Sequence, residues 1–600
     1  MTRVVVAGRG PAARGAGLAL AGRRVDRVAP AAGVVVAAAV LALAVAAALT
    51  RPAVDAPLVA GIRAGLAVDG LSALMVVTVA AATLAVLGYA AGEAELRTAR
   101  FVGCMLLFAG AMLVTVTATT LAVLLMSWEV MGAMSWALIA YHWREPESVR
   151  AAHTAFLTTR LADVGLYVAA GAALAGGVGS LALAELPAAT EPWLHVVAAG
   201  LVVAALGKSA QLPLSFWLSQ AMRGPSPVSA LLHSATMVAA GAYLLLRLAP
   251  LLETAGWAAP LVAWVGAATA LLMGLVAVAQ SDLKQLLAAS TCAQIGFMVL
   301  AAGVGGVAGG ALQLVAHAAT KSLLFLAAGA WLVLLGTKQL GELRGAARRY
   351  PLVGVTFTIG AAALAGLPPL SLWVTKDLVL AAALEQNTAL YVVGMAAAVV
   401  SAIYSTKAVW WIWQPPPSDE RRVRRIGTDE SAVRRNAFLP LSVLAALAAL
   451  FGIPVLAWGT WELDVPELLS GGLAIAAALV TWRLAGRIGA PSLLASWLGL
   501  ERLAHAVIVR PVLVLARALA RFDDRLDGSV TALARGTVAL ARGLDRRGEG
   551  AVEGAVRGIT DGARALGRLA RRPQTGQVHQ YYAQAAAALA VLALVVIVMG

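Results

Sequence analysis

Charged residues are scarce in this sequence. Only 13% of its 600 residues are Asp, Glu, Lys or Arg, whereas soluble domains carry roughly 25%. This scarcity excludes an ordinary soluble enzyme or binding domain. Hydrophobic residues make up 60% of the chain, and apolar runs of about 20 residues, long enough to cross a bilayer, recur along nearly its whole length. The sequence therefore predicts an all-α polytopic membrane protein with about 15 or 16 transmembrane helices.

Cysteine is almost absent as well. Cys104 and Cys292 are the only two cysteines, and each lies in an apolar run. They are too few for a disulfide framework, a zinc site or an iron–sulfur cluster. We therefore expect no cofactor in this chain, so that any redox chemistry would belong to another subunit.

Acidic residues are fewer than basic ones, which gives the chain a net charge of +15. Such an excess could suit nucleic acid, but the basic residues lie in short loops beside apolar runs, for example residues 344–350 and 420–427. Loops of this kind favour cytoplasmic anchoring or contact with anionic lipids. Residues 4–15 imitate a glycine-rich dinucleotide turn, but Pro11 fits poorly there and no further βαβ element follows. We expect the lipid membrane as a partner, and no nucleic acid.

The chain divides into four segments. Residues 1–30 precede a transmembrane core at 31–490, an Arg-rich amphipathic region follows at 491–573, and a final transmembrane anchor covers 574–600. From Glu501 to Arg572 the sequence has 14 Arg against 8 Asp or Glu, and its apolar residues recur every three, four or seven positions, as on one face of a helix. The many glycines of this region predict breaks in that helix. A helix on the membrane surface and a strut along neighbouring proteins both fit this pattern.

Several ionisable residues interrupt the apolar runs. A charge inside the hydrocarbon costs from about 2.5 to above 10 kcal/mol, so its presence there indicates an ion path or a functional site. Proline inside a spanning helix leaves backbone carbonyl groups without their helical partners, and a lysine beside such a break has polar company. Unlike arginine, a buried lysine can load and release a proton. The candidate residues are Glu129, Asp163, Lys208, His233, His317, Lys321, Lys376 and Asp377.

Two of these lysines lie beside proline-broken helices at corresponding places. Pro213 follows Lys208, and Pro368 and Pro369 precede Lys376, about 170 residues further along the chain. Broken helices at matching positions of two halves are typical of transporters that are built from inverted repeats.

Plainer interpretations of some charged residues remain open. Lys284 and Lys407 could simply extend toward lipid headgroups, as lysines near span ends do. Asp163 could pair with Arg160, three residues earlier, at the edge of the membrane.

Five segments of the chain, in this order, resemble the antiporter-like subunits shared by respiratory complex I and Mrp-type cation/proton antiporters. The resemblance covers roughly Leu66 to Ala457. Beyond it, the amphipathic region, PQTGQVHQYYAQ (573–584) and the last span resemble the L subunit of complex I. The five segments are SWEVMG (127–132), GKSAQLPLSFWLSQAMRGPSPVSALLHSATMVAAGAYLL (207–245), SDLKQLLAASTCAQIGFM (281–298), HAATKSLLFLAAGA (317–330) and LAGLPPLSLWVTKD (364–377).

The resemblance implies two inverted antiporter-like repeats, a lateral helix along the membrane arm, and a final anchor. It also implies a proton path. Glu129 would pair with Lys208 in a first half-channel, with Asp163 near that pair, and His233 would lead toward the centre. His317 and Lys321 would form the central relay, and Lys376 with Asp377 the second half-channel.

The resemblance further implies a non-redox subunit of a proton-translocating NADH–quinone oxidoreductase in the inner (plasma) membrane of the cell. Its partners would be other membrane subunits, especially antiporter-like ones along the lateral helix. NADH, FMN, iron–sulfur clusters and quinone would be bound by partner subunits. Three rivals remain: an Mrp-type antiporter subunit, a membrane partner of a hydrogenase or inorganic-carbon uptake complex, and a purely structural subunit.

The sequence departs from the family pattern at several places. Gln313 stands where a second histidine is frequent, four residues before His317, and Leu378 stands where an acidic residue is common. Arg223 replaces a small or acidic residue, and WVTKD replaces the more usual FFSKD. These changes predict a proton path that is wired differently between the two half-channels.

Overall fold

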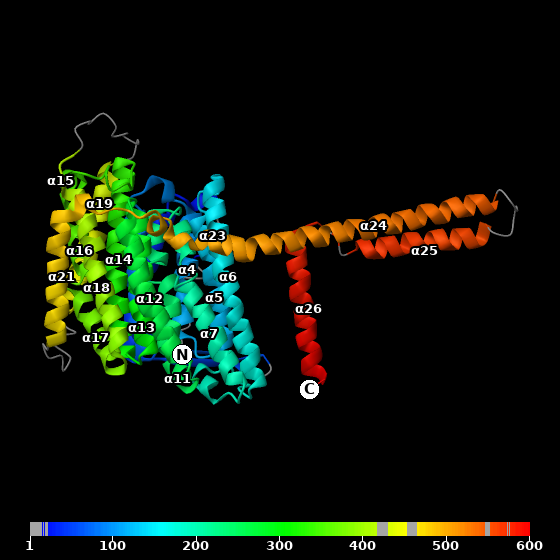
Figure 1. Ribbon diagram of the computed structural model, residues 1–600, viewed down its shortest axis with the longest axis horizontal. Coiled ribbons are helices and arrows are strands. Elements are labelled where there is room, and N and C mark those ends of the chain that lie inside the picture. Colours follow the sequence, from blue (N-terminus) through cyan, green and yellow to red (C-terminus); the bar gives the residue numbers. More distant parts are fainter. Residues whose placement is uncertain are drawn as a thin grey trace. The chain divides into compact units, whose positions relative to one another are not determined.

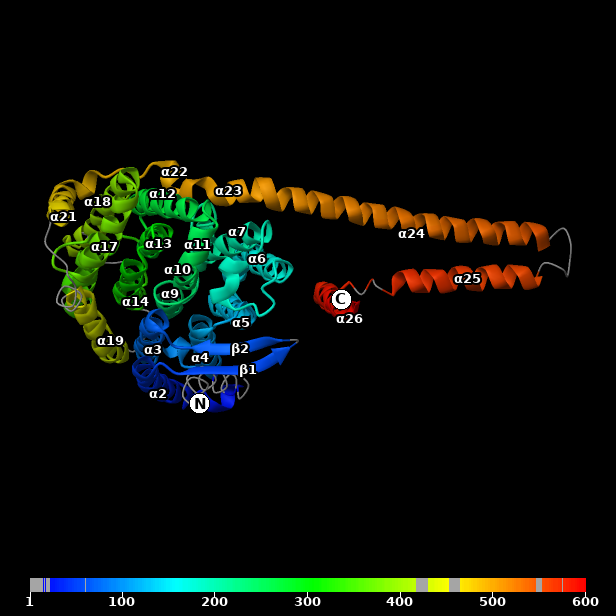
Figure 2. The ribbon, with the colours of Figure 1, turned by 90° about the horizontal axis from the view of Figure 1, so that it is seen from below.

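The computed structural model describes residues 15, 17, 22–59, 61–416, 430–452, 465–545, 553–572, 574 and 576–599. The chain forms two compact units, Met1–Glu501 and Arg502–Gly600. The first unit is a bundle of helices (Figure 1) with one antiparallel hairpin of strands, β1 (Ala53–Val59) and β2 (Ile62–Ala67) (Figure 2).

Long apolar helices make up most of the first unit. The described residues contain 13 helices long and apolar enough to cross a membrane, one of which, Trp497–Leu544, has 48 residues and is about twice the length that a bilayer needs. The long helices of the first unit are α2 (Ala29–Thr50), α3 (Gly70–Ala90), α4 (Ala99–Thr117), α5 (Leu121–Ile139), α6 (Pro146–Ala175), α12 (Ala258–Ala279), α13 (Leu283–Gly303), α14 (Val307–Leu335), α18 (Thr388–Trp413), α19 (Glu430–Leu450) and α21 (Val465–Leu484).

Three crossings consist of two shorter helices each, and one of them, Ser226–Arg247, is among the 13 just counted. With these pairs and a final helix in the second unit, the described crossings confirm the expected all-α polytopic fold. The pairs are α7 (Trp193–Lys208) with α8 (Phe216–Ala221), α9 (Ser226–Leu232) with α10 (Met237–Arg247), and α16 (Pro351–Ala365) with α17 (Ser371–Gln386). Short helical segments connect the crossings: η1 (Gly22–Val25), η2 (Ala94–Leu96), η3 (Leu183–Ala188), α11 (Ala249–Thr254), α15 (Ala346–Arg349), η5 (Ala485–Arg487), α22 (Ser492–Ala495) and η6 (Trp497–Gly499).

The break between α7 and α8 follows from local chemistry. Pro213 has no N–H group, and Ala210 adopts a left-handed conformation with φ 52°, so the helix cannot continue through them. The carbonyl oxygen of Gly207 that the break releases accepts a hydrogen bond from Trp217 Nε1 at 2.9 Å. A side chain of α8 thus helps to stabilise the break inside the bundle.

A second break separates α16 from α17. Gly366, with φ 77°, ends α16, and Pro368 and Pro369 follow it. The freed carbonyl oxygen of Leu364 accepts a hydrogen bond from the Lys376 ammonium group at 2.9 Å. Both breaks predicted from proline therefore occur, and each lies beside a lysine.

The two broken helices run in opposite directions. Helices α11 and α15 lie at opposite ends of the first unit (Figure 1). Helix α10 ends beside α11, so that the crossing before it, α7–α8, runs away from the α11 end, whereas α16–α17 starts beside α15 and runs toward the α11 end. This opposite course is what an inverted pair of repeats requires.

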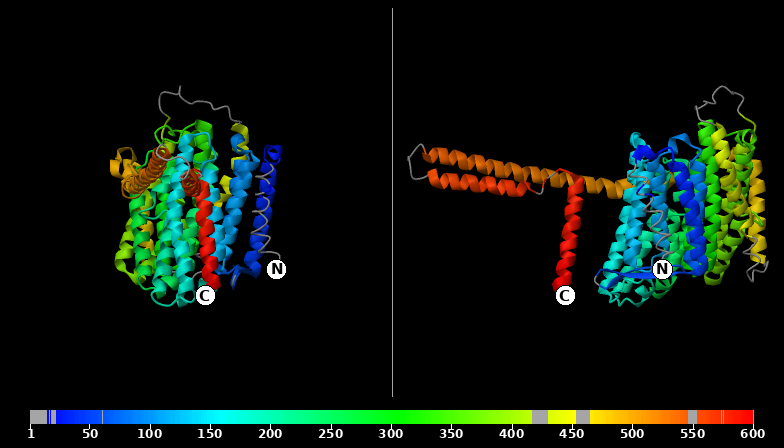
Figure 3. Two further views of the ribbon diagram at one scale, coloured as in Figure 1. Left: turned by 90° about the vertical axis from the view of Figure 1, so that its right-hand side faces the viewer. Right: turned by 180° about the vertical axis from the view of Figure 1, so that it is seen from behind.

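The connecting segments accordingly gather at two ends, which we name after these helices. The strands β1 and β2 lie at the α11 end (Figure 3). The α15 end comprises residues 91–98, 140–145, 222–225, 280–282 and 336–350, and the α11 end comprises residues 51–69, 118–120, 176–192, 248–257 and 304–306.

The second unit contains α24 (Arg510–Asp545), α25 (Glu553–Arg571) and α26 (Val578–Met599). Helix α23 (Leu500–Ala504) and the π-helix η7 (His505–Val509) precede α24. Helix α26 is the final span that the sequence predicts. At 1.5 Å per residue, the 36 residues of α24 extend about 54 Å.

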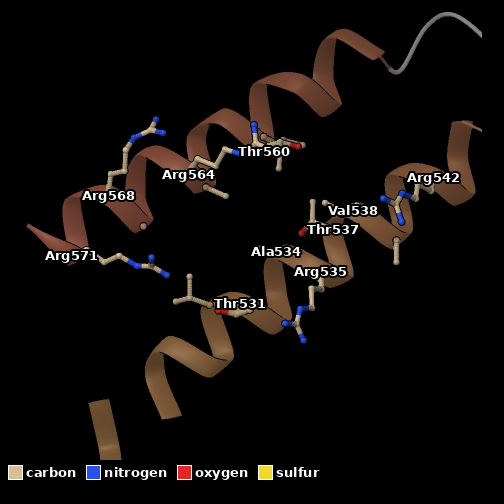
Figure 4. Close-up of a pocket in the computed structure, with 15 residues that line it drawn as sticks. Thr531, Ala534, Arg535, Thr537, Val538, Arg542, Thr560, Arg564, Arg568 and Arg571 are labelled. Carbon is tan, nitrogen blue, oxygen red and sulfur yellow. The ribbon is translucent and has the colours of Figure 1, made fainter. Parts of the chain in front are cut away.

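Helices α24 and α25 lie side by side and antiparallel (Figures 1 and 2). An ion pair joins Arg571 to Asp527 at 3.9 Å, and the side chain of Gln574 donates to Asp523 at 3.2 Å. A groove of about 660 Å³ between the two helices is lined by arginine and threonine side chains, such as Arg535 and Thr560 (Figure 4). The amphipathic region is thus two paired helices rather than one rod.

Glycine does not break α24. The helix continues through Gly528, Gly536 and Gly543. The glycines at 548 and 550, where a break was also expected, lie outside the described residues. The packing of α24 against α25 outweighs the destabilisation of the helix, about 1 kcal/mol per glycine, at these positions.

We expect substitutions at Gly165 and Gly200 to separate α6 from α7. A Cβ atom at either glycine would overlap the backbone carbonyl oxygen of the other. Gly165→Val and Gly200→Val should each destabilise the protein by about 1–3 kcal/mol, because overpacking forces the helices apart. The measurement is the apparent Tm of the solubilised protein. Gly171→Ala, where the added Cβ meets no atom within 4 Å, is the control, and an unchanged Tm for Gly165→Val would contradict the close packing.

Candidate functional site

Buried ionisable side chains occur on several helices of the first unit. The side chains of Lys208 and Lys321 are fully buried, and that of Lys376 is 2% exposed. These lysines come from α7, α14 and α17. We call the buried side chains of Lys208, His233, His317, Lys321 and Lys376 the central row.

Lys208 is held by an aspartate. Its ammonium group lies 2.9 Å from Asp163 Oδ2, and both side chains are buried. Trp128 Nε1 donates to Asp163 Oδ1 at 2.7 Å, and the Trp128 ring lies 5.1 Å from the lysine nitrogen. Each oxygen of the carboxylate thus has a donor, as a buried ion pair requires.

Glu129 has a different partner from the one that the sequence predicts. It forms an ion pair with Arg160 and accepts a hydrogen bond from Tyr167 at 2.8 Å. The expected pair of Glu129 with Lys208, and the alternative pair of Asp163 with Arg160, are both absent from the described residues. The reason is the rotation of α6: Arg160, Asp163 and Tyr167 are spaced three and four residues apart, so that α6 presents its cation to Glu129 and its aspartate to Lys208.

Glu129 nevertheless lies close to Lys208 along α5. A Cβ atom added to Gly132, one turn after Glu129, would lie 3.6 Å from the Lys208 ammonium nitrogen. The lysine therefore touches α5 one turn from the glutamate. Glu129 is the more accessible acid, with a side chain that is 29% exposed against 4% for Asp163.

Lys321 occupies the centre of the row with neutral partners. Its ammonium group donates to the Leu287 carbonyl oxygen at 3.1 Å and to the Ser290 hydroxyl. The next residue, Ser322, shares a hydrogen bond of 2.7 Å with Ser234. A carboxylate partner of Lys321 is missing from the part of the chain that the structure describes.

The two histidines of the row lie without protein partners. His233 and His317 are fully buried, and no side chain or backbone group among the described residues bonds to any of their ring nitrogens. His233 lies at the break between α9 and α10, with its ring 6.1 Å from that of Trp217. Buried nitrogens of this kind commonly bind ordered water.

Gln313 connects three helices in place of the expected histidine. Its amide nitrogen donates to Gln294 of α13 at 3.1 Å, and its amide oxygen accepts from Thr375 of α17. Gln294 in turn donates to the hydroxyl of Tyr404 at 2.9 Å. The chain of hydrogen bonds thus leads from α13 to the residue that precedes Lys376.

Lys376 and Asp377 point to different elements. Lys376 donates to Ser401 at 2.7 Å as well as to the Leu364 carbonyl oxygen, whereas Asp377 accepts a hydrogen bond from Ser470 of α21 at 2.7 Å. The two residues are therefore neighbours in sequence without forming an ion pair. Lys376, like Lys321, is held by neutral oxygens.

Lys284 and Lys407 do not extend toward headgroups. Lys284 is 2% exposed and donates to the Gly224 carbonyl oxygen at 2.9 Å. Lys407 is 6% exposed and donates to the carbonyl oxygens of Val278 and Gln280 at the end of α12. A cation at the carboxyl end of a helix compensates the partial negative charge there, so that Lys407 has a structural role.

Sequence reasoning missed several members of the site. Arg160 and Tyr167 share the helical spacing of Asp163, which could have indicated their common face. Trp128, Ser290 and Gln294 carry no such signal, because their roles depend on which helices meet. The described residues contain no group of three or more His, Cys, Asp or Glu side chains that could bind a metal ion.

The fold and the row define a class of protein: a polytopic membrane protein with ionisable groups buried along broken helices. Residues 118–403 match the family described as NADH:quinone oxidoreductase/Mrp antiporter, transmembrane. Subunit L of the NADH-quinone oxidoreductase of Pseudomonas aeruginosa is 34% identical over 512 residues, which cover 78% of this chain and 81% of that protein. The chain belongs to this family.

Other relatives match over a shorter stretch. NAD(P)H-quinone oxidoreductase chain 5 of a Picosynechococcus species is 37% identical over 366 residues, 57% of this chain and 55% of that protein. The chain thus spans about half the length of this relative. These proteins are subunits of an enzyme complex, as their names state.

Two solved structures share the fold. The Mrp complex from Dietzia sp. DQ12-45-1b matches with a TM-score of 0.72 and 28% identity, over 90% of this chain and 62% of the matched chain. Respiratory complex I from Thermus thermophilus matches with a TM-score of 0.66 and 27% identity, over 79% of this chain and 99% of the matched chain.

We expect Asp163→Asn to destabilise the protein by about 3–5 kcal/mol, because it leaves the buried Lys208 charge without its partner. The double variant Asp163→Asn/Lys208→Met should recover most of this loss, since it removes both charges. The measurement is thermal inactivation of the solubilised protein. The control is Asp55→Asn, which breaks an exposed pair with Arg63 and should cost about 0–1 kcal/mol. Equal stability of the Asp163 and Asp55 variants would contradict the assignment.

Proposed function

We propose that this chain conducts protons across the membrane as a non-redox subunit of a complex I-like NADH–quinone oxidoreductase. The observation that carries the proposal is the central row, in which buried lysines and unpartnered histidines lie beside two oppositely directed broken helices. Membership of the NADH:quinone oxidoreductase/Mrp antiporter family supports it. A buried lysine is suited to this task because it can exist with or without its proton.

The first step involves the exchange of partners around Lys208. While Asp163 Oδ2 lies 2.9 Å from the ammonium nitrogen of Lys208, the carboxylate stabilises the charged lysine. When Lys208 turns toward Glu129 one turn away on α5, the pair with Asp163 opens and Arg160 is released from Glu129. While Lys208 moves from Asp163 to Glu129, its buried positive charge has no carboxylate partner. Its proton therefore moves to the nearest neutral base.

The remaining steps follow the row. His233, His317 and Lys321 receive the proton in the centre, with water joining the groups that lack protein partners. Gln313, Gln294 and Thr375 orient the connection between Lys321 and Lys376. Lys376 releases the proton beside the broken end of α16, with Asp377 as the acid nearest to it in sequence.

The loops support one orientation of the chain. Positively charged loops remain on the cytoplasmic side of bacterial membranes. We assign the α15 end to the cytoplasm and the chain to the inner membrane of the cell, with several spans. The loops of the α11 end carry Arg51 and Arg63, whereas those of the α15 end carry Arg97, Arg144, Arg223, Lys338 and Arg344.

Partner subunits would supply the redox chemistry. NADH, FMN, iron–sulfur clusters and quinone would be bound there. The paired helices α24 and α25 expose large apolar side chains, such as Leu533 at 73% and Leu566 at 71% exposure, which suits contact with antiporter-like subunits along the membrane. The final span α26 would fix this region to the bilayer.

We expect Lys208→Met and Lys376→Met each to lower the rate of proton pumping about tenfold or more, because each removes a group that must carry the proton. The measurement is the ratio of protons to electrons in vesicles that contain the purified complex, with assembly checked by native electrophoresis. Arg144→Met, which removes an exposed loop cation at the α15 end, should leave the ratio unchanged. An unchanged ratio in both row variants would refute the proposal.

A cation/proton antiporter subunit is the second candidate, favoured by the match to the Mrp complex over 90% of this chain. It predicts that a Na⁺ or K⁺ gradient drives proton movement without any electron donor. The measurement is the internal pH of vesicles after a salt jump. Proton movement that requires NADH and quinone excludes this candidate, as well as the hydrogenase and inorganic-carbon rivals.

A further inference from the structure

A second group of buried charges lies at the α15 end, outside the central row. Glu93 follows the last turn of α3, and Lys284 lies in the first turn of α13. The two are close enough for their charges to interact. Glu93 Oε1 and the hydroxyl of Tyr89, one turn earlier, are buried without a close hydrogen-bond partner among the described residues.

Glu93 is prepared to change its charge near neutral pH. Burial raises the pKa of Glu93 to about 7, and the positive charge of Lys284 acts in the opposite direction. The other groups that act on Glu93 are Tyr89 and Glu95, and those that act on Lys284 are Lys338 and Asp282. Glu93 thus lies among few charges, with Lys284 as its cation.

Lys284 connects this end to the interior of the bundle. Its bond to the Gly224 carbonyl oxygen ties it to the segment between α8 and α9. Its charge also acts on His233, which lies at the end of α9. Gln285 strengthens the same junction, because its side chain exchanges hydrogen bonds of 2.9 and 3.0 Å with Ser219 of α8.

The same helix leads to Lys321. The Leu287 carbonyl oxygen that holds Lys321 at 3.1 Å lies on α13, about one turn from Lys284. From the other side, Ser234 follows His233 and bonds to Ser322, the neighbour of Lys321. Helix α13 and the segment from Gly224 to Ser234 thus connect the surroundings of Glu93 and Lys284 with those of His233 and Lys321.

We propose that Glu93 and Lys284 form a proton-uptake site at the α15 end that loads the central row through His233. The inference rests on the proposed function and adds its point of uptake. In the first transfer the Glu93 carboxyl group gives its proton to the neutral amine of Lys284, which leaves a carboxylate and an ammonium group. In the second, the ammonium group gives the proton to a neutral ring nitrogen of His233 and becomes an amine again.

The first test observes the carboxyl group itself, independently of pumping. Infrared difference spectra of the purified complex over a pH series should contain a buried-carboxyl band that titrates near pH 7. The band should vanish in Glu93→Gln. It should persist in Glu95→Gln, the matched change two residues further along the same loop, but titrate at a lower pH, because the charge of Glu95 raises the pKa of Glu93. Lys284→Met removes the cation that favours the carboxylate, so that the band should titrate at higher pH. Absence of the Glu93 band would overturn the proposal.

The second test measures transport. Lys284→Arg keeps a cation that can bond to the Gly224 carbonyl oxygen, but an arginine cannot release its proton. We expect Lys284→Arg and Glu93→Gln to assemble and to lower the pumping rate about tenfold, while Glu95→Gln pumps normally.

Lys321→Met, measured in parallel, distinguishes a failure of the uptake site from a failure of the proposed function. If Lys321→Met stops pumping but Lys284→Arg and Glu93→Gln pump normally, the uptake site is refuted and the proposed function stands. If Lys321→Met also pumps normally, the proposed function itself is refuted.

Discussion

A positive charge in an apolar bundle requires oxygen atoms that accept its hydrogen bonds, and most carbonyl oxygen atoms inside a helix already accept one from the helix backbone. In the membrane an uncompensated ammonium group costs several kcal/mol. For Lys376 this chain meets the requirement with a carbonyl oxygen at the broken end of α16. Lys208, the last residue of α7, is instead held by Asp163, and Lys321 shares the Leu287 carbonyl oxygen of the continuous helix α13. The break and the buried charge therefore depend on each other at α16–α17.

The groups that compensate the positive charge of a lysine differ along the central row, and the proposed mechanism depends on this difference. Asp163 offers Lys208 a full negative charge, so removal of the lysine's proton would leave a buried carboxylate alone. Lys321 and Lys376 are held by hydroxyl and carbonyl oxygens, which accept a hydrogen bond from an amine as well as from an ammonium group. The first lysine thus has an anionic partner, whereas the other two have neutral partners. In the proposed function, a row of this design would hold the proton beside Asp163 and pass it on at Lys321 and Lys376.

The sequence predicted those features that arise from local chemistry. Proline specifies both breaks, so the ends of α7 and α16 could be predicted from Pro213 and Pro368, although α19 continues through Pro440. Buried lysines in apolar runs could be found by composition alone. The partners of Glu129 and Asp163 could not be predicted, because they depend on the rotation of α6 against α5 and α7. The same limit applies to α25, whose return along α24 depends on side chains more than 40 residues apart, such as Asp527 and Arg571. The roles of the row residues in transport stay predictions.

The two halves of the bundle run in opposite directions and give their lysines different partners, and this difference would give proton transfer in the proposed function a direction. An inverted pair of identical half-channels would pass protons equally well both ways, since each step would have its mirror image. Here the α6–α7 half supplies an aspartate to its lysine, and the α16–α17 half supplies Ser401 and directs Asp377 away to Ser470. Lys208 therefore has a carboxylate partner, whereas the partners of Lys376 are neutral oxygen atoms. In the proposed function, transfer toward Lys376 would follow the opening of the pair of Lys208 with Asp163, so that whatever opens this pair would control the flow.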